Sequence, residues 1–263
     1  MTGQQLIAPG AGAPGADTRV KVLGALRWVF SDPDWTKSLL FACVFMLIPI
    51  VGPIALAGWM CEIHQRLVRG HPRPMPRLDF NDFVHYLSRG VNPFVVQLVV
   101  TLPAVLVMYG LLTAGALSIV VAERAGRTSV GLLVVAAALG LVVLVGSLVV
   151  AVLINAAQTR AELTEDIGQA LSFGELMRYS RATWKTVIWK TIVFSFVALG
   201  LVLCGLLLCY FGLYPAIVVI QLASCSLRFQ IYRDYLHRGG TPIAVKAPVA
   251  LPSGTPQPAY PGY

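Results

Sequence analysis

Charged residues are scarce in this chain. Of its 263 residues, 12% are Asp, Glu, Lys or Arg and 57% are hydrophobic, whereas a soluble domain carries about 25% charged residues. Four segments contain no charge at all, with lengths of 24, 32, 32 and 37 residues: 38–61, 91–122, 128–159 and 191–227. Because about 20 apolar helical residues cross a bilayer core, each segment is long enough to span a membrane. The pattern argues against a soluble fold and predicts an all-α, polytopic transmembrane helix bundle.

Motifs for catalysis and cofactor binding are also missing. The sequence has no GxSxG, P-loop, HExxH or dinucleotide-binding pattern. Its five cysteines all lie in the apolar segments without a CxxC pair, as expected of small buried hydrophobic side chains. Glu62 and His64 are two residues apart, so they should point to different sides of a helix and form no metal site. We therefore expect no catalytic residue, no cofactor and no metal.

Proline and glycine divide the first and last apolar segments. Pro49, Gly52 and Pro53 should break the first segment into two helices, over about residues 34–49 and 53–69. A single kinked span remains the alternative. Gly212 and Pro215 should form the turn of a second hairpin, and Pro103 should kink the second apolar segment.

The positions of Lys and Arg favour one topology. If the first and last segments are hairpins, the chain crosses the membrane about six times, with 18 Lys and Arg on the cytoplasmic side and 2 outside. A first segment that forms one span gives 14 and 6, and two single outer spans give 10 and 10. The positive-inside rule favours six crossings of the inner (cytoplasmic) membrane with both termini in the cytoplasm. The net charge of +8 is thus explained by membrane anchoring, and no nucleic acid is expected.

Three flanking segments are predicted to be amphipathic interfacial helices. Residues 19–30 place Leu23, Leu26 and Phe30 on one stripe, and residues 79–89 form a second such helix. Ser172 and Glu175 form a capping box that begins the third. The membrane domain should cover residues 19–240, between a Gly/Ala/Pro-rich disordered tail (1–18) and a Pro-rich one (241–263).

Six polar residues and one small residue within the apolar segments are the candidate polar and packing residues of a site. They are Gln97, Ser147, Ala151, Asn155, Gln158, Gln221 and Ser224. Ser147, Ala151 and Asn155 have the i, i+4, i+8 spacing of a small-residue stripe, which favours close helix packing with one interhelical hydrogen bond. A path for a substrate is the alternative.

Three stretches resemble a known family of prokaryotic membrane proteins. They are Asp32-Pro33-Asp34-Trp35 with the following Ile48-to-Pro53 and Gly58-Trp59 elements, the segment from Arg69-Gly70 to Arg89-Gly90, and Asp166-to-Glu175. In these stretches the chain is similar, over about residues 28–240, to the family catalogued as domain of unknown function 4013. The resemblance implies a polytopic helix bundle and brings no activity or catalytic residue.

The absence of buried charges and catalytic groups favours a non-enzymatic scaffold or accessory protein. Its partners would be the lipid bilayer and an anionic lipid or protein at the basic cytoplasmic face. One alternative is a carrier or channel for a neutral or amphiphilic solute. Another is a lipid-modifying enzyme, for which Glu62, Asp79 and Asp82 are the plausible acids.

Overall fold

The computed structural model describes residues 20–124, 130–207 and 211–248. These residues form helices and contain no β-strand, which confirms the all-α prediction. The helices are α1 (Val22–Val29), α2 (Trp35–Met46), α3 (Val51–Val68), the 3₁₀ helix η1 (Phe80–Asp82), α4 (Phe83–Arg124), α5 (Val130–Thr164), α6 (Ile167–Ala170), α7 (Phe173–Leu207) and α8 (Leu213–His237). Residues 1–18 and 249–263 of the predicted tails lie outside the described residues.

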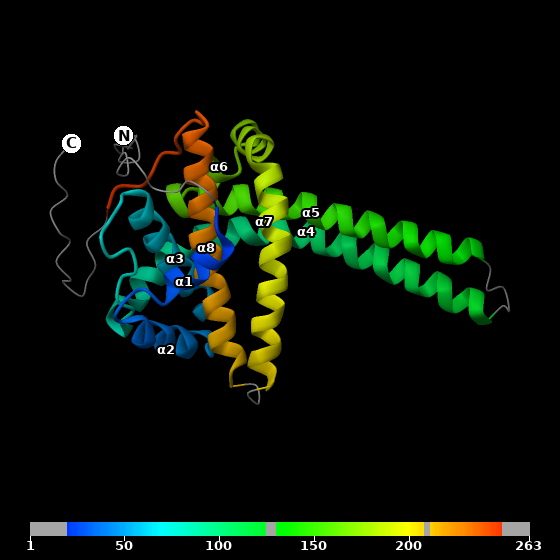
Figure 1. Ribbon diagram of the computed structural model, residues 1–263, viewed down its shortest axis with the longest axis horizontal. Coiled ribbons are helices and arrows are strands. Elements are labelled where there is room, and N and C mark those ends of the chain that lie inside the picture. The colour runs from blue at the N-terminus through cyan, green and yellow to red at the C-terminus, as the bar shows by residue number, and fades with distance from the viewer. Residues whose placement is uncertain (1–19, 125–129, 208–210, 249–263) are drawn as a thin grey trace.

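Two long helical pairs dominate the molecule. Helices α4 and α5 run side by side and extend far beyond the other helices (right in Figure 1). Helices α7 and α8 form the second pair, which crosses the first near its base, and α1, α2 and α3 lie beside α8. The outer parts of α4 and α5 therefore contact mainly each other.

The first apolar segment is broken where proline and glycine predict. Helix α2 ends at Met46 and α3 begins at Val51, and Ile50 between them has a positive φ of 67°. A Cβ on Gly52 would lie 1.8 Å from the carbonyl oxygen of Phe45, so only glycine allows the two helices to meet this closely. Pro53 lies in the first turn of α3, where its missing N–H breaks no helical hydrogen bond.

Neither half of this segment is a long apolar helix. Helix α2 has 12 residues, which span about 18 Å. Helix α3 has 18 residues, but its second half carries Glu62, His64 and Arg66. The helical break is thus established, whereas passage of these two helices through a membrane stays a prediction.

The other predicted breaks differ from one another. Gly212 precedes α8 and Pro215 lies in its first turn, so the last apolar segment is divided between α7 and α8 as expected. Helix α4 continues without a break through Pro93 and Pro103, so the predicted kink at Pro103 stays a prediction.

One predicted interfacial helix needs correction, because residues 79–89 do not form a separate helix: η1 leads directly into α4. Residues 22–29 are helical as predicted, and their buried face, Val22, Ala25 and Val29, packs toward α8. Leu23 and Phe30 of the predicted stripe are exposed on the opposite face, so the location of α1 at a membrane surface stays a prediction.

The third of these helices begins close to the predicted capping box. Helix α7 starts at Phe173, but the Ser172 hydroxyl donates to the Gln169 carbonyl (2.9 Å) and accepts from Arg160 (3.1 Å). Glu175 pairs with Arg160 (3.6 Å) and Arg178 (3.2 Å). Both side chains therefore bind the arginines that surround the helix start.

Helices α3 and α4 meet through two glycines. A Cβ on Gly58 would lie 1.8 Å from the Tyr86 carbonyl oxygen, and a Cβ on Gly90 would lie 1.8 Å from that of Ile54. Small residues of this kind let two helix backbones approach closely. The contact brings the polar second half of α3 beside the beginning of α4.

The packed part of the chain continues past residue 240. Ile243 and Val245 are buried, and the Ile243 amide donates to the Tyr232 hydroxyl (2.8 Å). The Lys246 amide donates to the carbonyl of Leu163 at the end of α5 (2.9 Å). Residues 241–248 thus belong to the folded unit, because their apolar side chains have a place against α5 and α8.

The glycine contact yields a stability prediction. Gly58→Ala should destabilise the protein by about 1–3 kcal/mol, because its methyl group forces α3 and α4 apart. Thermal unfolding in mild detergent measures the loss. Gly110→Ala is the matched control. A Cβ at Gly110 would have no described atom within 4 Å apart from its chain neighbours and the backbone of its own helix. Equal melting temperatures for the two variants would contradict the close contact.

Candidate functional site

A network of buried ion pairs forms where the apolar segments end. At its centre is Arg89 of α4, which is 5% exposed. Its guanidinium donates to the carboxylates of Glu62 on α3 and Glu165 beyond α5, and to the Gln65 side-chain oxygen at 3.0 Å. Glu62 also accepts from Arg66 at 2.6 Å. One arginine thus joins three segments that are distant in the sequence.

Glu165 connects this network to the C-terminal segment. Its carboxylate accepts from Lys246 (2.8 Å) as well as from Arg89 and Gln65. Burial alone would raise the pKa of Glu165, but the hydrogen bonds and charges of Arg89 and Lys246 outweigh it and hold the pKa below its usual range. Glu165 also has a positive φ of 50°, a strained conformation that the surrounding contacts maintain.

A second buried group lies beside the first. Glu162 of α5 accepts from Arg228 of α8, at 2.6 Å to one carboxylate oxygen and 3.2 Å to the other. The second oxygen also lies 2.6 Å from Nδ1 of His64 on α3. His64 is fully buried, and its Nε2 has no hydrogen-bond partner among the described residues.

Buried ions are costly unless every charge has a partner. Removal of one member of such a pair typically costs 3–5 kcal/mol, because the remaining charge is left unpaired in a medium of low dielectric constant. The two groups together connect α3, α4, α5 and α8. They therefore fix which helix ends lie together.

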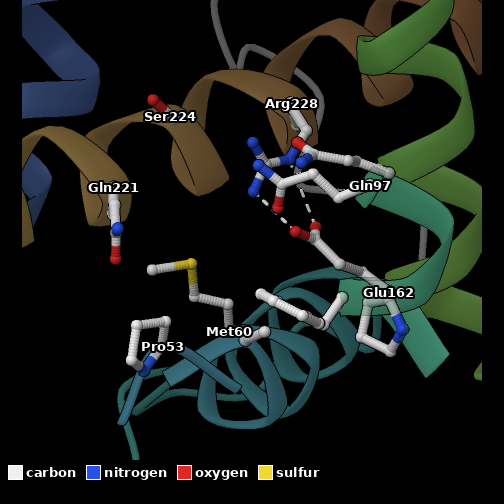
Figure 2. A pocket seen from close by; sticks show the side chains of 11 residues that line it. Pro53, Met60, Gln97, Glu162, Gln221, Ser224 and Arg228 are labelled. Carbon is white, nitrogen blue, oxygen red and sulfur yellow. Dashed lines mark hydrogen bonds and ion pairs between the residues drawn. The ribbon is translucent and has the colours of Figure 1, made fainter. Parts of the chain in front are cut away.

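A cavity of about 310 Å³ lies next to the Glu162–Arg228 pair. It is lined by Pro53, Ala57, Met60, Pro93, Phe94, Gln97, Gln158, Glu162, Gln221, Ser224 and Arg228. Figure 2 shows Gln97, Glu162 and Arg228 at one end, with Pro53, Met60 and Gln221 toward the other. Each helix contributes residues three or four positions apart, so one face of α3, α4, α5 and α8 points into the cavity.

Four of the seven candidate residues from the sequence line this cavity. Gln97, Gln158, Gln221 and Ser224 all line it, although α4, α5 and α8 are far apart in the sequence.

The other three candidates do not line the cavity. The Ser147 hydroxyl donates to the Leu144 carbonyl of its own helix (2.7 Å), and Ala151 is half-buried. The Asn155 side-chain oxygen is buried without a hydrogen-bond partner among the described residues. The packing role of this stripe stays a prediction.

Sequence reasoning missed the ion pairs. Glu62, Arg89 and Arg228 lie directly beside the uncharged segments, and Glu162 lies three residues beyond one. Opposite charges at the ends of several apolar segments were the available signal. The spacing of Glu62 and His64 describes α3 alone, whereas the carboxylate next to His64 is Glu162 of α5.

Fold and site together define a class of protein. Among the described residues, four helices are long and apolar enough to cross a membrane: Phe80–Ala122, Val130–Thr164, Phe173–Leu207 and Leu213–His237. A helix that is apolar on all sides suits lipid surroundings, so the fold is that of a helical membrane protein.

Comparison with known proteins then gives the family. The family model described as "Protein of unknown function (DUF4013)" matches residues 41–224, and the chain belongs to this family. No curated protein and no solved structure matches the chain significantly.

The network predicts unequal effects of two arginine substitutions. Arg89→Met should cost about 3–5 kcal/mol of stability, because Glu62 and Glu165 lose their shared partner. Arg178→Met, which removes an exposed pair with Glu175, should cost about 1 kcal/mol or less. Denaturant titration in detergent micelles compares the two. A small loss for Arg89→Met would show that the network is not buried as described.

Proposed function

We propose that the chain is a multi-pass protein of the inner (cytoplasmic) membrane that carries a small neutral or amphiphilic solute. The observation that supports this function is the convergence of Gln97, Gln158 and Gln221 from three helices on one cavity. Amide side chains each offer two donors and an acceptor without net charge. They suit a solute that has hydroxyl, amide or zwitterionic groups.

The exposed surface of the α4–α5 pair supports the membrane location. Large apolar side chains point outward along both helices, among them Leu106, Leu117, Val134 and Leu144, each 58–65% exposed. Apolar patches of this extent are rare on soluble monomers. Lipid acyl chains are the surroundings that fit them.

The ion-pair network supports one orientation. Glu62, Arg89, Glu162 and Arg228 lie at the segment ends that the six-crossing topology assigns to the cytoplasm. A cluster of ionisable groups is less costly near the polar interface than at the bilayer centre. Gln97, Gln158 and Gln221 lie about one to two helical turns from these charges, toward the membrane interior in this topology.

The lining of the cavity suits an amphiphile. Ala57, Met60 and Phe94 provide apolar surface, while Glu162 and Arg228 neutralise each other. A solute with a net charge would find no free counter-ion in the cavity, because Glu162 and Arg228 are already paired with each other. Cavities that hold small molecules generally combine apolar walls with a few placed polar groups.

The other two hypotheses have less support from the geometry. The acids suggested for a lipid-modifying enzyme do not line the cavity: Glu62 is bound by Arg66 and Arg89, and Asp79 accepts from the Asn81 amide (3.1 Å). The scaffold hypothesis depends on the basic face alone. It stays a prediction, and no single contact favours it.

Flux through proteoliposomes tests the carrier function. Glycerol, urea and a headgroup-labelled short-chain phospholipid are suitable probes, since each is neutral or zwitterionic. Wild-type protein should accelerate the passage of at least one probe. Gln97→Leu and Gln221→Leu should each reduce that rate at least about tenfold. Each substitution leaves a polar group of the solute without its hydrogen-bond partner, which weakens binding by roughly 1.4 kcal/mol or more.

Asn155→Leu is the matched control, because Asn155 is an amide outside the cavity lining. It should retain the wild-type rate. No flux above empty liposomes for any probe, or equal losses in all three variants, would refute the carrier function.

A further inference from the structure

We propose that His64, Glu162 and Cys225 form a binding site for a divalent transition-metal ion, of which Zn²⁺ fits best. The three residues come from α3, α5 and α8, and all are buried. One ligand atom of each lies within 4.8 Å of the others. This site does not depend on whether the neighbouring cavity carries a solute.

The three ligand atoms lie near enough to one another that side-chain movements of about 1 Å would admit an ion. Zinc is held at about 2.0 Å by nitrogen or oxygen and 2.3 Å by sulfur, so tetrahedral ligand atoms lie about 3.3–3.8 Å apart. His64 Nδ1 and the Glu162 oxygen are at a hydrogen-bond distance of 2.6 Å and would separate by about 0.7 Å to admit the ion. The Cys225 sulfur makes a long contact, 3.8 Å to the Met60 carbonyl oxygen, and is hydrogen-bonded to the Arg228 guanidinium.

An unpartnered imidazole nitrogen is the second observation. His64 is fully buried, yet its Nε2 has no hydrogen-bond partner among the described residues. A buried polar atom normally has a partner, so Nε2 indicates a group, such as an ordered solvent molecule, that the described residues do not supply. A histidine that binds a metal through one nitrogen usually donates with the other, so an Nε2–H that donates to solvent fits a ligand that binds the ion through Nδ1.

The charges around the site suit a cation held by two anionic ligands. On binding, the Cys225 thiol would release its proton to solvent and bind as thiolate. The Glu162 oxygen next to His64 would bind the ion in place of its 3.2 Å hydrogen bond from Arg228, while the other oxygen keeps its 2.6 Å bond to Arg228. Arg228 would thus orient the carboxylate, as outer partners of metal ligands do.

The cavity offers access to the ion and room for a fourth ligand. Glu162 lines the cavity, and so does Met60, whose carbonyl contacts Cys225. Three protein ligands with one open position are typical of zinc sites that bind a solvent or substrate molecule. A mixed sulfur and nitrogen ligand set favours Zn²⁺ over Mg²⁺ or Ca²⁺.

Cobalt spectroscopy of the full-length protein in detergent tests the site. After chelator treatment and dialysis, Co²⁺ should bind at one ion per chain. It should give a thiolate-to-cobalt charge-transfer band and the visible bands of tetrahedral cobalt, and Zn²⁺ should abolish both. Failure of the wild-type protein to give a thiolate band would overturn the proposal, whatever the variants do.

Three variants identify the ligands. Cys225→Ser should lose the charge-transfer band, and both Cys225→Ser and His64→Gln should bind Zn²⁺ at least tenfold more weakly. Cys43→Ser is the control, because Cys43 lies on α2, outside the cluster. It should keep the wild-type spectrum. A band that survives in Cys225→Ser, or disappears in Cys43→Ser, would assign the ion elsewhere and refute the site.

Thermal unfolding provides a readout for variants that fold poorly. Excess Zn²⁺ should raise the melting temperature of the wild-type protein and of Cys43→Ser, since an ion that binds the folded state stabilises it. The rise should be clearly smaller for Cys225→Ser, because its site binds the ion more weakly. Equal shifts in all three proteins would mean nonspecific binding and would contradict the proposal.

Discussion

The fold depends on charges that cannot remain unpaired where the apolar segments end. Arg89 lies between Glu62 and Glu165, and Arg228 lies against Glu162, so each of these five charges has an opposite partner on another segment. In a low dielectric an unpaired ion is much less stable than a paired one. Many helix arrangements would bury apolar surface equally well in lipid, but few would pair these ions. The network therefore selects the arrangement, and the close contact between Gly58 and Gly90 lets α3 and α4 reach it.

The cavity and the buried histidine follow from this arrangement. The helices that carry the ion pairs also carry Gln97, Gln158 and Gln221 one or two turns away, so pairing the ions brings the amides together. His64 is placed beside Glu162 by the same contact of α3 with α5. Solute binding and metal binding, as proposed, would both use side chains that the network positions. The outer parts of α4 and α5 have a different role, since lipid is their expected surroundings.

The sequence predicts the local features well and the long-range ones poorly. Apolar segment length identifies the helices, and Pro49 with Gly52 identifies a break, because both effects act within a few residues. The pairing of Gln65 with Glu165 joins residues 100 positions apart, which no local pattern encodes. Periodicity likewise identifies the apolar stripe of Leu23 and Phe30 on α1, but it does not show that the opposite face packs against α8, because the neighbouring helix decides which face is buried. The sequence identifies Gln97, Gln158 and Gln221 as candidates one by one, but only the structure shows that they line the same cavity.

The most direct test of this account is labelling of single cysteines from the two sides of the membrane. In a cysteine-free background, cysteine would replace Arg73, Gly168 or Arg238, which are exposed near the network, or Phe211, which is exposed between α7 and α8. A membrane-impermeant maleimide should reach the first three positions from one side only, and Phe211→Cys only from the other. Labelling of the first three from different sides would contradict the account, because the ion pairs could not then meet at one surface.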